Sequence, residues 1–203
     1  MNTLAKIICF IFLFTTQVNA NSDVTKWLQL EIDNILKTYQ DDNITKSERF
    51  QKIENTVNKN FAGAGIAKFV AGKAWATAGK ETKKTYIDLF KRHLALNIAS
   101  LMQGYSKQSY LFKDTKVDKK NNVYMIDMEV KDKTNNLLIT WRVKESKEKF
   151  YVIDLLVADI SLVVAKRSEF NSILKKIDYD LKDFNAKLYK QNEKSYNKLT
   201  QQS

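Results

Sequence analysis

The spacing of apolar residues changes twice along the chain, from a helical period to a period of two and back. From residue 23 to residue 105, apolar side chains recur every three or four positions, as in amphipathic helices. From residue 111 to residue 144 they alternate with polar ones, as in strands that bury one face. Helical spacing returns after Asp159. The pattern therefore predicts helices first, then a sheet, then helices again.

Three longer helices and one region of short helices are predicted before the sheet. They cover residues 23–39, 46–61 and 81–105, with the Gly- and Ala-rich short-helix region at 62–79. After the sheet, one helix contains Arg167 and Phe170, and a last helix covers residues 178–190. The tail from Gln191 onward is polar, and we expect it to fray.

Four strands are predicted, at residues 111–117, 123–131, 137–144 and 150–158. Short, polar, Asn-rich links join them, which indicates an antiparallel meander. One face of the second and third strands is apolar and is called the dry face below; its residues are Tyr124, Ile126, Met128, Val130, Leu137, Ile139, Trp141 and Val143. The predicted fold class is α+β, a four-stranded antiparallel meander with helices from both ends of the chain packed on its apolar face.

The fourth predicted strand is apolar at nearly every position, and Asp154 is its only interruption between residues 151 and 158. A buried carboxylate needs a partner, and Arg142 and Arg167 are both candidates. We expect Asp154 and Arg167 to act together at the turn between sheet and helix, because a guanidinium grips a carboxylate or a phosphate with two donors.

The first residues have the features of an export signal. Lys6 supplies a positive start, residues 7–14 form an apolar run too short to span a bilayer, and Val18-Asn19-Ala20 is a small-x-small cleavage site. The predicted boundaries are a cleaved signal at 1–20, one domain at 21–190 and a polar tail at 191–203. Because the single cysteine, Cys9, leaves with the signal, we expect no disulfide and no thiolate site in the mature chain.

The chain has a formal charge of +11, and removal of Lys6 with the signal leaves +10. A basic surface attracts anionic lipid surfaces or acidic partners, and the export signal argues against nucleic acid.

The sequence offers few candidates for a phosphate, metal or catalytic site. Gly63-Ala64-Gly65 lacks the Gly-Lys-Ser/Thr ending of a phosphate loop. His93 is the only histidine, so a histidine-based metal site is not expected. Asp127 and Glu129 share one strand face at a spacing compatible with the carboxylate pair of a glycosidase, but this spacing is far more typical of a solvated strand face. We therefore expect no metal, no cofactor and no enzyme activity.

Three short motifs follow one another around the predicted turn from sheet to helix: Phe150-Tyr151-Val152-Ile153-Asp154, Ile160-Ser161-Leu162 and Arg167-Ser168-Glu169-Phe170. A fourth, Ile66-Ala67-Lys68-Phe69-Val70-Ala71-Gly72-Lys73-Ala74-Trp75, precedes the long helix. Their order and spacing resemble those of the MlaC-type family of periplasmic phospholipid carriers, also called the toluene-tolerance auxiliary family. The family usually has Glu-Gly where this chain has Ala158-Asp159.

The resemblance implies a monomeric periplasmic carrier that shuttles a glycerophospholipid between outer-membrane and inner-membrane components of an ABC-type transport system. Its partners would be an outer-membrane lipoprotein complex and an inner-membrane lipid transporter complex, contacted transiently. The acyl tails would lie in an apolar cavity enclosed by sheet and helices. The candidate lipid-binding residues are Phe69, Trp75, Phe90, Leu94, Leu101, Met102, Tyr105, Ile126, Met128, Trp141, Ile153 and Arg167.

Two other kinds of function fit the same pattern. An NTF2-like exported enzyme would use Asp154 or His93 as a base in an apolar pocket. An adaptor domain that binds no lipid would fill the same cavity with its own side chains. Phospholipid that co-purifies with the protein would distinguish a carrier from both.

Overall fold

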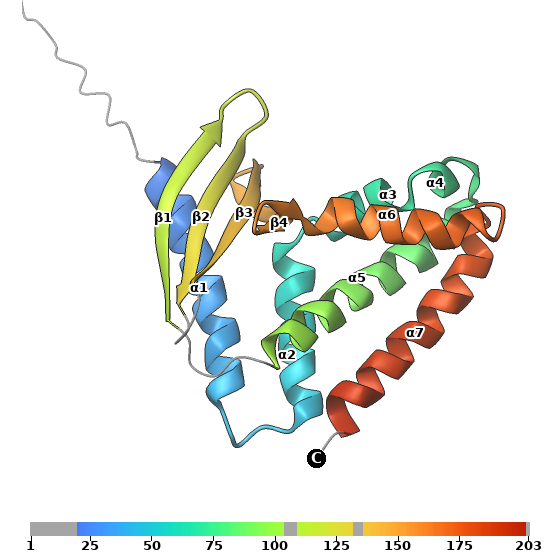
Figure 1. Cartoon of the computed structure of the whole chain (residues 1–203), viewed down its shortest axis with the longest axis horizontal. Helices are drawn as coiled ribbons and strands as arrows, with labels where there is room; N and C mark the ends of the chain where they lie inside the picture. The colour runs from blue at the N-terminus through green and yellow to red at the C-terminus, as the bar shows by residue number, and fades with distance from the viewer. Residues whose placement is uncertain (1–19, 104–108, 132–135, 202–203) are drawn as a thin grey trace, which may run out of the picture.

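The computed structural model describes residues 20–103, 109–131 and 136–201 (Figure 1). The described part starts with helices α1 (Ala20–Gln40), α2 (Lys46–Asn60), α3 (Gly63–Ala71), α4 (Lys73–Thr77) and α5 (Lys80–Met102). The strands are β1 (Ser109–Asp118), β2 (Val123–Lys131), β3 (Asn136–Ser146), β4 (Lys149–Val157) and β5 (Ile160–Ser161). Helices α6 (Leu162–Lys175) and α7 (Leu181–Gln201) follow. The predicted α+β class is confirmed.

The strands form one antiparallel sheet in the order β1-β2-β3-β4-β5. The prediction of four strands is one short, because the two-residue β5 pairs with the end of β4 immediately after the turn. In that turn Ala158 and Asp159 have φ angles of 47° and 63°. Both residues are therefore left-handed without a glycine, a conformation that costs an ordinary residue about 1–2 kcal/mol.

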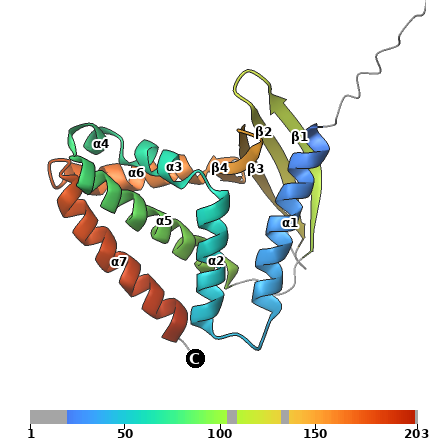
Figure 2. The same ribbon diagram turned by 180° about the vertical axis from the view of Figure 1, so that it is seen from behind.

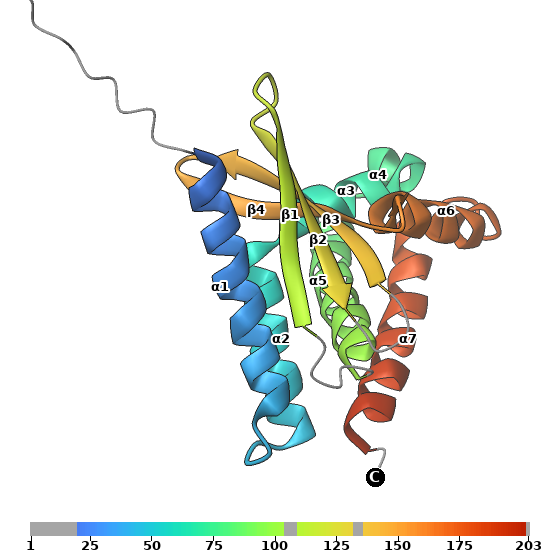
Figure 3. The ribbon, with the colours of Figure 1, turned by 60° about the vertical axis from the view of Figure 1, so that its left-hand side comes forward.

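Helices α1, α2 and α5 lie on the same side of the sheet, and α1 runs along β1 and β2 (Figures 2 and 3). The apolar face of α1 buries Val24 and Leu28 completely, at 0% and 1% exposure. Trp27 packs on Phe150 with the two ring centroids 5.6 Å apart. Helix α2 starts with a capping box, in which Thr45 and Glu48 each bond the other's backbone N–H.

Helix α5 packs on α2, α3 and α7. From α7, the Asn185 side chain donates to the Thr82 carbonyl over 3.0 Å, and the Asn192 side chain donates to the Leu89 carbonyl over 2.9 Å. A cluster of aromatic rings joins α5, α6 and α7, and its members are Tyr86, Phe90, Phe170 and Phe184. These helices therefore hold α5 in place through contacts that do not involve the sheet.

The last helix is longer than the sequence pattern predicts. The expected frayed tail is wrong over residues 191–201, because α7 continues to Gln201. Asn192 is fully buried, Leu199 is 8% exposed, and the Tyr196 ring lies 5.3 Å from the Phe50 ring of α2. These three residues extend the helical stripe of Leu188. The stripe was not recognised in the sequence because Asn192 and Tyr196 carry polar atoms and were counted as polar positions.

Within the described ranges, no helix combines the length and the apolar character needed to cross a bilayer.

Candidate functional site

The dry face is one continuous apolar surface across the strands. Ile126 of β2 lies opposite Trp141 of β3, and Trp141 lies opposite Leu155 of β4. The next row contains Met128, Ile139 and Val157. Directly opposed residues of antiparallel strands point to the same side of a sheet. The rows therefore form a single apolar wall that contains no charged side chain.

Burial decreases along this wall from one end to the other. At one end Tyr124, Val143 and Val152 are 5%, 0% and 2% exposed. At the other end Leu137 is 42% exposed and Ile160 is 64% exposed. Ile160 pairs with Val157 and shares its side of the sheet. The helices therefore cover the dry face at one end and leave it open at the other.

Helix α5 carries an apolar stripe toward the same open end. The stripe consists of Leu94, Ile98 and Leu101, spaced four and three residues apart, and Leu101 is 69% exposed. Tyr39 fixes this part of α5 against α1, because its hydroxyl donates to the Ala99 carbonyl over 2.7 Å. Leu94 and Ile98 pack against the same hydrophobic core as Ile139, Trp141 and Leu155 of the sheet. The stripe and the dry face therefore share one core.

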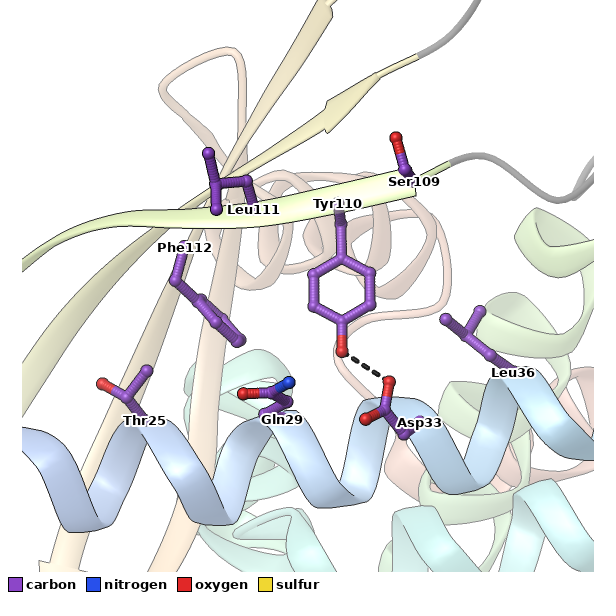
Figure 4. A pocket seen from close by; sticks show the side chains of 8 residues that line it. All are labelled: Thr25, Gln29, Asp33, Leu36, Ser109, Tyr110, Leu111 and Phe112. Atoms are coloured by element: carbon purple, nitrogen blue, oxygen red, sulfur yellow. Dashed lines mark hydrogen bonds between the residues drawn. The ribbon is translucent and has the colours of Figure 1, made fainter.

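A groove of about 630 Å³ borders the dry face between α1 and β1 (Figure 4). Its lining residues are Thr25, Gln29, Asp33 and Leu36 of α1 and Ser109, Tyr110, Leu111 and Phe112 of β1. The Tyr110 hydroxyl donates to Asp33 Oδ1 over 2.6 Å, which satisfies the one carboxylate of the lining. Tyr110 and Phe112 pair with Val130 and Met128. The groove is thus continuous with the open part of the dry face.

The dry face offers one polar atom that is not satisfied. Trp141 Nε1 is buried and has no hydrogen-bond partner among the described residues. An indole N–H can only donate, and leaving such a donor unpaired costs about 1–3 kcal/mol.

The carboxylates of the opposite face of the sheet are already engaged. Thr140 donates to Asp127 Oδ1 over 2.6 Å, and Lys113 Nζ lies 3.0 Å from a Glu129 oxygen. The hydrogen bond from Lys113 lowers the pKa of Glu129 below its ordinary value. Both carboxylates therefore already have polar partners, as expected for a solvated strand face and not for an acid–base pair.

A model of the MlaC protein family matches residues 29–190, which is most of the chain. The protein belongs to the MlaC family. No curated protein matches the sequence. Among solved structures, the phospholipid-binding protein of Ralstonia solanacearum, determined in complex with a phospholipid, is similar with a TM-score of 0.70 and 17% identity. The match covers 83% of this chain and 96% of that one. At this identity the likeness shows a shared fold.

In this MlaC-family protein, six of the predicted lipid-binding residues lie on the dry face or in the last turns of α5. Ile126, Met128 and Trp141 are on the dry face, and Ile126 and Met128 are buried. Leu94, Leu101 and Met102 are in the last turns of α5. Tyr105 lies outside the described residues. Sequence reasoning placed Leu137 and Ile139 on the dry face without naming them as site residues, although the same alternation marked them.

The other predicted residues lie elsewhere. Phe90 and Trp75 belong to the aromatic cluster around Tyr86 in the helical part of the MlaC-family fold. Ile153 lines a separate pocket of about 450 Å³ beside Tyr151 and the start of α3. Phe69 and Arg167 are both exposed where α3 packs on α6. These five positions do not join the wall of the open end.

The predicted pairing of Asp154 with Arg167 is wrong. Arg142, directly opposite on β3, supplies the ion pair at 3.4 Å. Asp154 also accepts from the Ser161 hydroxyl over 2.6 Å and from the backbone N–H groups of Leu155 and Val163, over 2.8 and 3.1 Å. The carboxylate therefore ties β4 to the start of α6, whose cap is Ser161. Its role in this MlaC-family chain is to fix the sheet-to-helix turn.

His93 is a buried member of the helix cluster. The Asn192 amide nitrogen is used on the Leu89 carbonyl, so its oxygen accepts from His93 Nδ1 over 3.1 Å. Nε2 is then the unprotonated atom, and it has no partner among the described residues. Burial, assisted by the charge of Lys166, lowers the pKa of His93 to about 4. Among the described residues, no group of three or more His, Cys, Asp or Glu could hold a metal ion.

The low pKa of His93 predicts a stability that falls in acid. The folded protein resists protonation down to about pH 4, whereas the unfolded chain takes up the proton near pH 6.5. The contribution of neutral His93 to the free energy of unfolding is therefore complete above pH 6.5. It is lost as the pH falls toward 4, and the loss is roughly 3 kcal/mol. Urea unfolding of wild type and His93→Gln at a series of pH values measures it. The variant should have a flatter profile across this window, and parallel profiles would contradict the assignment.

Proposed function

We propose that this protein binds a phospholipid with its acyl chains between the dry face and the α5 stripe and carries it through the periplasm. The observation that carries the proposal is the half-covered dry face. A sheet with one apolar face normally buries that face completely. Here the apolar rows continue to Leu137 and Ile160, which are 42% and 64% exposed. An acyl chain is a ligand that would complete the burial.

Two comparisons support a lipid as the ligand. The chain is a member of the MlaC family, and the similar Ralstonia protein was solved in complex with a phospholipid. Both favour a binding protein over an enzyme. The chemistry of the wall agrees, because Ile139, Leu155 and Val157 offer apolar contact and no catalytic group.

The energetics of transfer suit this arrangement. Burying each CH₂ group of an acyl chain is worth roughly 0.8 kcal/mol, so a chain of ordinary length gains enough to remain bound without charged contacts. The head group would then lie beyond Leu137 and Ile160, in contact with water.

The proposed carrier role has consequences outside the site. We place the mature protein in the periplasm as a monomer that loads and unloads at an outer-membrane lipoprotein complex and an inner-membrane transporter of the ABC type. The support is the family and the signal-like segment at residues 1–20. Sequencing of the N-terminus of the exported protein should begin at Asn21. A protein that retains Met1 would refute export by signal cleavage.

Narrowing the space beside the dry face should reduce the amount of bound phospholipid. Ile139 lies between Met128 and Val157 in the half-open row, and an Ile139→Trp substitution adds volume where the acyl chain would lie. Native mass spectrometry of the freshly purified variant should show phospholipid on a much smaller fraction of molecules than in wild type, with the melting temperature little changed.

Leu138 provides the matched control on the same strand. It is the next residue, is 41% exposed and points to the opposite face of the sheet. Leu138→Trp should keep the wild-type lipid content. Equal lipid content in all three proteins, or a protein that purifies without lipid and does not take it up from vesicles, would contradict the proposed function.

A further inference from the structure

Helices α3, α4 and α6 form one side of the molecule, away from the C-terminus (Figures 1 and 2). Helix α3 packs on both α4 and α6. This side, called the α3–α6 face below, contains residues 62–79 and 160–176. It has two properties that the proposed cargo does not explain, an excess of positive charge and a set of exposed apolar side chains.

The charge of the α3–α6 face is mainly positive, and the exposed carboxylates of Asp159, Asp178 and Asp180 lie just outside the ends of its second segment. Its basic residues are Lys68, Lys73, Lys166, Arg167, Lys175 and Lys176, and its single acidic residue is Glu169. Glu169 is neutralised by Lys166 over 2.6 Å. Residues 62–79 contain no carboxylate at all. Surfaces of this kind attract anionic surfaces at long range, with about 1 kcal/mol per cation close to an anionic membrane.

Apolar side chains protrude among these cations. Phe69 of α3 is 44% exposed, Leu162 and Val164 of α6 are 36% and 51% exposed, and Ile160 just before them is 64% exposed. Exposed apolar groups surrounded by cations are typical of surfaces that insert into the boundary between head groups and acyl chains.

Arg167 and Phe69 present both properties together. The guanidinium lies over the Phe69 ring, with 4.5 Å between its central carbon and the ring centroid. It also donates to the Phe69 carbonyl over 2.8 Å. These two contacts join α6 to α3 and keep the apolar Phe69 ring beside the fixed charge of Arg167. Lys68 is exposed on the adjacent position of α3.

We propose that the α3–α6 face docks on the head-group region of an anionic bilayer. The charge complementarity selects an anionic surface, and the exposed Phe69 and Val164 select one with an accessible apolar layer beneath the charge. The proposal goes beyond the cargo role, because it concerns the outside of the fold and shares only Ile160 with the dry-face rows. Ile160 links the two, since it is exposed at the open end and directly precedes the start of α6.

Vesicle binding tests the proposal. Flotation with vesicles of equal parts phosphatidylglycerol and phosphatidylcholine should recover the full mature chain at low salt, and vesicles of pure phosphatidylcholine should not. Binding should weaken in high salt.

Substitutions on the α3–α6 face should weaken binding to the anionic vesicles. Lys68→Gln should lower the partition coefficient roughly fivefold, which corresponds to about 1 kcal/mol for one cation. Val164→Asp should lower it roughly tenfold or more, and Ala165→Asp, at an exposed small residue, provides a second variant of the same face.

Leu30→Asp on α1 and Lys52→Gln on α2 are the matched controls. Leu30 is 58% exposed and Lys52 is also exposed, on helices outside the α3–α6 face. Both should bind vesicles as wild type does.

Two results would overturn the proposal. One is a loss of vesicle binding in the controls equal to the loss in Val164→Asp and Lys68→Gln. The other is binding to an acidic protein without any binding to anionic vesicles. Phospholipid content measured separately should be normal in every variant, so failure of docking is distinguishable from failure of the cargo role.

Discussion

The structure depends on one constraint: the apolar face of the sheet has to be covered, and the helices cover only part of it. Val24 and Leu28 of α1 are completely buried in the shared core, and Val143 and Val152 of the sheet lie in the covered part. Beyond them the rows through Met128 and Val130 extend to exposed apolar residues. Exposed apolar surface costs free energy in water in proportion to its area. A fold that retains such a surface gains from any ligand that covers it.

The open part persists because α5 is held by other helices. If α5 depended on the sheet for its position, it would move onto the dry face and close the space. Instead, Asn185 and Asn192 of α7 bond its carbonyls, Arg92 lies 3.2 Å from Glu54 of α2, and Phe170 and Phe184 pack with their ring centroids 4.8 Å apart at its other side. Close-packed aromatic interiors resist collapse into neighbouring space. On the sheet side, Asp154 and Ser161 fix where β4 gives way to α6.

Much of the fold and part of the candidate site could be predicted from the sequence. The features that could not be predicted have physical reasons. Alternation placed Ile126, Met128 and Trp141 on one face, because the pleat leaves no other choice. Periodicity on α5 marked Phe90 as buried, but it does not say which of several neighbours buries it, and the neighbours are α6 and α7. The partner of Asp154 depends on strand register, including the irregularity between Arg142 and Val143, which no local pattern reveals. The continuation of α7 was hidden because Asn192 is a polar residue with a buried structural role.

The most direct test of the central claim is where an acyl chain lies relative to the three tryptophans, Trp27, Trp75 and Trp141. Variants that retain a single tryptophan, with phenylalanine at the other two positions, can be loaded with a phospholipid whose acyl chains carry bromine, which quenches indole fluorescence on contact. The account predicts strong quenching of Trp141 on the dry face and little quenching of Trp75 in the aromatic cluster. Quenching of Trp75 with an unaffected Trp141 would place the acyl chains among the helices and contradict it.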